Sequence, residues 1–117
     1  MADDDGGLLH VRGIRYARAA RFAAPQPLAP WSDVIDATAR GPVCPQLPSR
    51  LEWVTGSVVD GLAMSEDCQV LSVTAPSDAD RLPVMVWFHG GAYVSGGGES
   101  PVRSVVAGLR CRIPNFR

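Results

Sequence analysis

The chain has 117 residues, with eleven basic residues (all arginine) against twelve acidic ones and a net charge of −1. This balance gives no reason to expect a nucleic-acid partner. No apolar run is long enough to cross a membrane and no signal-peptide core is visible, so we expect a cytoplasmic protein without a membrane partner. A chain of this length forms at most one small domain.

The first hundred residues divide into a few segments. Residues 1–7 are acidic and end in glycine, which predicts a solvated, disordered start. Residues 8–17 read as a strand, and residues 18–30 as an extended connection rich in alanine and proline. Prolines and glycines in residues 42–65 predict a long irregular loop. Partial alternation of apolar residues predicts a second strand over residues 69–75.

The most informative stretch is Val84–Gly98, VMVWFHGGAYVSGGG. Residues 84–88 are a continuous apolar run that ends at histidine and glycine, a pattern typical of a strand buried on both faces in an α/β sheet. His89, Gly90, Gly91 and Ala92 would then lie at the carboxyl end of that strand, where open α/β sheets place their ligand sites. Residues 95–98 read as a flexible loop.

Together these stretches resemble the type-B carboxylesterase/lipase family, the cholinesterase-like α/β-hydrolases. An ordered series of motifs carries the resemblance: residues 13–17 (GIRYA), 21–22 (RF), 25–27 (PQP), Trp31, 37–38 (AT), 41–46 (GPVCPQ), 65–68 (SEDC) and 82–91 (LPVMVWFHGG). One piece alone would be weak evidence, but the set in this order is specific to the family.

The resemblance implies the amino-terminal portion of an α/β-hydrolase fold, comprising the first strands of the central mixed sheet and long loops, and therefore incomplete. Residues 8–100 would be this family part. Residues 101–117 carry four arginines and no acid and depart from the family pattern, which suggests a reading-frame shift or a truncated gene; a divergent natural tail is the alternative. We expect such a fragment to be marginally stable, because the 84–88 strand would lack sheet neighbours.

By the same resemblance, the HGGA loop would form an oxyanion hole for hydrolysis of a small carboxylic ester. Gly91 and Ala92 would supply backbone N–H groups, and Gly90 would shape the turn. Ala92 stands where the family usually has glycine. No GxSxG serine elbow occurs and no histidine follows His89, so nucleophile, acid and base are absent. The resemblance implies neither a cofactor nor a metal, and no Cys/His cluster has zinc spacing.

Two residue pairs match structural positions of the family. Cys44 and Cys68 match a pair that forms a disulfide, which would contribute about 3 to 4 kcal/mol; two reduced thiols are the alternative in a cytosolic protein. Arg21 and Glu66 match a buried salt bridge, and losing one partner of such a pair costs about 3 to 5 kcal/mol. Two unrelated surface charges are the alternative. Cys111 has no counterpart. Trp53 is either a rim residue of the active-site gorge or an ordinary packing residue.

Three functions remain open at this point. The chain is an esterase fragment that is inactive alone, a non-catalytic cholinesterase-like binding module, or one half of a split esterase completed by a separately encoded carboxyl-terminal chain. A phosphate-binding loop is excluded, because Gly91 and Gly96 have the spacing but the chain contains no lysine.

Overall fold

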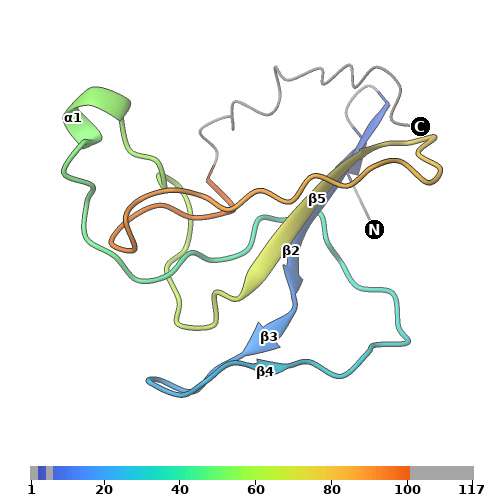
Figure 1. The fold of residues 1–117 in the computed structure, drawn as a ribbon, viewed down its shortest axis with the longest axis horizontal. Coiled ribbons are helices and arrows are strands. Elements are labelled where there is room, and N and C mark those ends of the chain that lie inside the picture. The colour runs from blue at the N-terminus through green and yellow to red at the C-terminus, as the bar shows by residue number, and fades with distance from the viewer. Residues whose placement is uncertain (1–2, 5–6, 101–117) are drawn as a thin grey trace.

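The computed structural model of the protein describes residues 3–4 and 7–100. The predicted tail at 101–117, with Cys111, lies outside the described residues. Two strands dominate the fold, β2 (Leu8–Arg15) and β5 (Val70–Pro76), and they cross the centre of the view in Figure 1. They confirm the two strands predicted at 8–17 and 69–75.

The main sheet is antiparallel, in the order β1-β2-β5. β2 pairs with β5 from Leu8 opposite Pro76 to Arg15 opposite Val70. The short β1 (Asp3–Asp4) pairs with His10 and Leu9 at the edge of β2. Such an edge strand needs only backbone partners, so the acidic sequence of residues 3–4 is compatible with the pairing.

A bulge interrupts the pairing of β2 with β5 between Val11 and Ile14. Gly13 lies in this bulge with φ +64°, a conformation that side chains other than glycine rarely adopt. A Cβ at Gly13 would lie 2.9 Å from the carbonyl oxygen of Ala39, and one at Gly41 would lie 2.7 Å from Cγ2 of Val70. The glycines therefore let the loop around residues 37–43 cross close over the sheet.

Short elements complete the fold. β3 (Ala17–Arg18) and β4 (Gln26–Pro27) form a two-stranded ribbon within the predicted extended connection. The long loop 42–65 contains α1 (Glu52–Thr55) and one parallel bridge between Val43 and Met64. Trp53 in α1 is 85% exposed, so it has no packing role within the described residues.

The predicted strand at 84–88 is wrong for this structure. The stretch has no ladder partner among the described residues and is drawn as a plain tube in Figure 1. Its side chains are 60% to 87% exposed. An inner strand exists only where neighbouring strands satisfy both of its edges, and the described sheet offers none to this stretch.

The hydrophobic core of the described residues is small. Its buried apolar members are Ala17, Ala37 and Val43. Such small side chains bury little area, at about 25 cal/mol per Å² of apolar surface. Polar contacts between loops therefore carry a large share of the tertiary organisation.

Candidate active-site loop

The glycine loop, residues 89–98, begins with a tight turn. The carbonyl oxygen of Gly91 accepts hydrogen bonds from the N–H groups of Val94 (3.0 Å) and Ser95 (3.1 Å). Gly91 has φ +115°, and a Cβ there would lie 1.7 Å from the carbonyl oxygen of Ser95, so only glycine fits. Ala92 and Tyr93 are also in the left-handed region, with φ +52° and +61°. Such a backbone is costly for alanine and tyrosine and is typical of functional turns.

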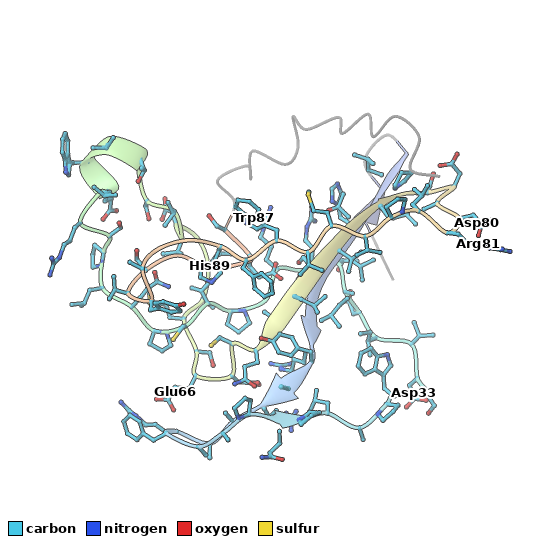
Figure 2. The ribbon with its side chains drawn as sticks, in the orientation of Figure 1. Asp33, Glu66, Asp80, Arg81, Trp87 and His89 are labelled. Atoms are coloured by element: carbon cyan, nitrogen blue, oxygen red, sulfur yellow. The ribbon has the colours of Figure 1, made fainter. Side chains whose placement is uncertain are left out.

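His89 contacts the backbone of this turn, and no acidic side chain pairs with it among the described residues. Its Nδ1 lies 2.7 Å from the carbonyl oxygen of Gly90. A carbonyl oxygen can only accept, so Nδ1 carries the hydrogen and donates it, which leaves Nε2 as an acceptor in the neutral ring. The contact fixes the histidine ring over the start of the loop, and Figure 2 shows His89 at this position.

The start of the turn contains three consecutive backbone N–H groups. Within the described residues, those of Gly90, Gly91 and Ala92 have no hydrogen-bond acceptor. The residues are exposed, so water satisfies these donors in the free chain.

The far end of the loop is attached to the sheet through Glu99, which is 2% exposed. Its Oε1 accepts hydrogen bonds from Oγ of Ser72 on β5 (2.6 Å) and from the N–H of Gly13 in the β2 bulge (3.3 Å). Arg40 donates to the Glu99 carbonyl oxygen at 2.7 Å. One buried carboxylate thus connects the loop to both central strands.

A second attachment lies at Gly96. The side-chain amide of Gln46 accepts a hydrogen bond from the Gly96 N–H (2.6 Å) and donates to the Gly96 carbonyl oxygen (2.8 Å). The next residue, Gly97, is so close to Val43 that a Cβ there would lie 2.5 Å from the valine Cγ1. The loop 42–46 therefore supports the glycine loop along two successive residues.

The structural pairs predicted from the sequence are found as follows. Arg21 Nη1 lies 3.3 Å from Glu66 Oε1, and the two side chains are 71% and 54% exposed among the described residues. Glu66 lies on the loop that precedes β5 (Figure 2). Cys44 and Cys68 are free thiols that interact with one another. The pKa of the Cys68 thiol is raised, mainly because the thiol is partly buried and further because Cys44 lies beside it.

Two cavities occur near the described loops. One of about 260 Å³ is lined by the 46–64 loop, including Gln46, Glu52, Asp60 and Met64. The other, of about 210 Å³, lies between the β2 bulge and Trp31. Neither includes residues 89–92. The described residues contain no cluster of metal-ligating side chains and no helix of the length and apolarity needed to span a membrane.

The arrangement corresponds to one part of an α/β-hydrolase esterase. The chain superimposes on a thermophilic PNB esterase with a TM-score of 0.70 and 42% sequence identity, covering 86% of this chain and 21% of that one. A second PNB esterase structure gives the same TM-score at 43% identity. The fold class predicted from the sequence is thereby confirmed at the level of an α/β-hydrolase portion with few strands.

The chain belongs to the carboxylesterase family, whose model matches residues 3–108. It is 44% identical over 103 residues to the para-nitrobenzyl esterase of Bacillus subtilis, covering 84% of this chain and 20% of the relative. It is 46% identical over 96 residues to a probable N-octanoylanthranilate hydrolase, AqdA2, of Rhodococcus erythropolis, covering 80% and 21%. The chain thus spans about a fifth of the length of these curated relatives. The match extends into the stretch beyond residue 100, where the sequence predicted a departure from the family.

Sequence reasoning missed two residues of the site, Gln46 and Glu99. Gln46 closes the GPVCPQ motif, and Glu99 directly follows the glycine run. The sequence around Glu99 does not indicate that its carboxylate is buried. Nothing in the sequence indicated that Gln46 contacts Gly96, because fifty residues separate them.

Proposed function

We propose that this chain supplies the oxyanion-stabilising loop of a serine carboxylic-ester hydrolase. The observation that carries the proposal is the turn at 90–92, where N–H groups without an internal acceptor follow one another in a chain of the carboxylesterase family. Gly91 and Ala92 act as the donors, and Gly90 forms the turn.

The chemistry follows from the charge that develops during ester hydrolysis. As a serine oxygen attacks the ester carbonyl carbon, the carbonyl oxygen becomes an anion in the tetrahedral intermediate. Fixed N–H donors stabilise this anion without reorganisation, and removal of one donor lowers the rate by about a hundredfold to a thousandfold. The substrate class is a small-molecule carboxylic ester, and no cofactor takes part.

The 117 residues do not hydrolyse esters by themselves, in this proposal. They contain no GxSxG serine and no histidine after His89, so the nucleophile, the acid and the base come from sequence outside these residues. A separately encoded carboxyl-terminal chain is the second candidate source. The exposed apolar stretch 84–88 favours completion by further strands, which would cover its side chains and pair its backbone.

The test is a chimera in which residues 3–108 replace the matching segment of the Bacillus subtilis para-nitrobenzyl esterase. We expect the chimera to hydrolyse p-nitrophenyl acetate, while the 117-residue chain alone does not. Replacing the Ala92 amide by an ester removes the N–H and leaves the methyl group, and it should lower kcat by about a hundredfold or more. Ala92→Gly keeps the N–H and is the matched control. A folded chimera whose kcat is unchanged by the ester replacement would refute the proposal.

A further inference from the structure

Gln46 is the feature of the site that the proposed chemistry does not use. Its half-buried side-chain amide lies against the backbone of Gly96 in a two-point pairing. Nε2 also donates to the carbonyl oxygen of Cys44 at 3.0 Å. These three partners fix the amide orientation, because a flipped amide would set its NH₂ group against the Gly96 N–H and its oxygen against two carbonyl oxygens.

Gly96 in turn lies against the start of the turn. With φ +95°, it has no room for a Cβ, which would lie 2.8 Å from the Gly90 carbonyl oxygen and 3.1 Å from Nδ1 of His89. The same Gly90 carbonyl oxygen accepts the hydrogen bond from His89. The Gly90 carbonyl belongs to the same planar peptide group as the Gly91 N–H, so a shift of Gly96 would be transmitted directly to this donor.

We propose that Gln46 is a positioning residue for the oxyanion donors, which acts by holding Gly96 against Gly90. The proposal rests on the proposed function for its catalytic consequence, but the contact itself can be tested independently. A primary amide suits this role because it presents one donor and one acceptor side by side, as a peptide group does in a β-ladder. An alanine or a charged carboxylate at position 46 lacks that combination.

The first measurement is amide hydrogen exchange at Gly96 in the full 117-residue chain, followed by NMR. We expect Gln46→Ala to raise exchange at Gly96 by about tenfold relative to the unsubstituted chain. Gln26→Ala, at an exposed glutamine of β4, is the matched control and should leave Gly96 unchanged. The same exchange is measured by mass spectrometry in the para-nitrobenzyl esterase chimera, so that the result does not depend on the stability of the free chain.

Gln46→Glu adds a readout that a purely structural role would not show. At pH 7 one oxygen of the introduced carboxylate still accepts from the Gly96 N–H, while the other repels the Gly96 carbonyl oxygen, so exchange should lie between that of the unsubstituted chain and that of Gln46→Ala. Near pH 4, about the ordinary pKa of a glutamate, a protonated carboxyl regains one O–H donor and one acceptor. The difference from the unsubstituted chain at the same pH should then shrink.

The catalytic consequence is read from the chimera with p-nitrophenyl acetate. Gln46→Ala should lower kcat by about tenfold to a hundredfold and leave KM within about twofold, because misplaced donors affect the transition state more than substrate binding. Unchanged exchange at Gly96 overturns the contact, and faster exchange with unchanged kcat overturns the positioning role. A folded but inactive unsubstituted chimera refutes the proposed function instead, and exchange at Gly96 then decides the contact alone.

Discussion

The buried carboxylate of Glu99 should be a main determinant of stability in this chain. Glu99→Ala removes the acceptor of two hydrogen bonds, from Ser72 Oγ and from the Gly13 N–H. At about 1 kcal/mol each, these bonds contribute about 2 kcal/mol. The other carboxylate oxygen, Oε2, is buried without a partner among the described residues. Burial of an unpartnered oxygen destabilises the fold, so its removal offsets part of the loss of the two hydrogen bonds. We therefore expect Glu99→Ala to lower the free energy of unfolding by about 1 to 2 kcal/mol.

The measurement is urea unfolding followed by tryptophan fluorescence and by far-UV circular dichroism. Glu99→Gln is the matched control, because its carbonyl oxygen still accepts from Ser72 and Gly13 while its NH₂ group replaces the unpartnered oxygen. We expect it to change the unfolding free energy by less than about 0.5 kcal/mol. The backbone contact from Arg40 is unaffected in both variants. Equal losses in the two variants, or no loss in Glu99→Ala, would refute the reasoning.

Three further predictions follow from the described contacts. Glu66→Ala should lower the unfolding free energy by less than about 1 kcal/mol, since the pair with Arg21 is exposed; a loss above about 3 kcal/mol in urea unfolding would instead indicate a buried pair. The raised pKa of Cys68 should slow its alkylation by iodoacetamide at pH 8 relative to free cysteine, as measured by mass spectrometry. Alkylation of Cys68 at the same rate as free cysteine would contradict the raised pKa. Because folding favours the neutral Cys68 thiol, its contribution to the free energy of unfolding is fully present below the unfolded pKa of about 8.5 and is lost as the pH rises through the higher pKa of the folded state. Gly13→Ala should lower the free energy of unfolding by about 1 to 3 kcal/mol, because the new methyl group adds both backbone strain and a steric clash. Gly56→Ala is the control, since Gly56 has φ +71° and open space around it, so this substitution adds the strain alone. Equal decreases of the melting temperature in the two variants would exclude the clash.

The strands of the sheet could be predicted because their signals are local. The partial alternation of residues 69–75 predicted β5, and the stretch 8–17, which reads as a strand, forms β2. The stretch 84–88 has an even stronger apolar signal, yet it forms no ladder among the described residues. Composition determines which segments can be buried, but pairing requires a partner strand with free backbone groups. No local pattern contains that information.

In the candidate site, too, one part could be predicted from the sequence and another could not. The HGGA motif located the turn, because glycine is needed where φ is positive and the backbone is crowded, as at Gly91. The supports of the turn, Gln46 and Glu99, could not be predicted. Each acts across a long sequence separation, fifty residues from Gln46 to Gly96 and eighty-six from Glu99 to Gly13. Their roles depend on where loops meet in space.

The balance between core and polar contacts has a consequence for the site. A loop that stabilises an oxyanion must hold its donors in place before the charge develops, since reorganisation would consume the stabilisation. In most domains a packed hydrophobic core provides that rigidity, but here the buried apolar residues are Ala17, Ala37 and Val43 among those described. The glycine loop is instead fixed by hydrogen bonds at Gly96 and Glu99, which are directional and fail when geometry shifts by a fraction of an ångström. Substitutions at these two contacts should therefore disturb the donor turn more than equal changes of apolar volume at the exposed stretch 84–88.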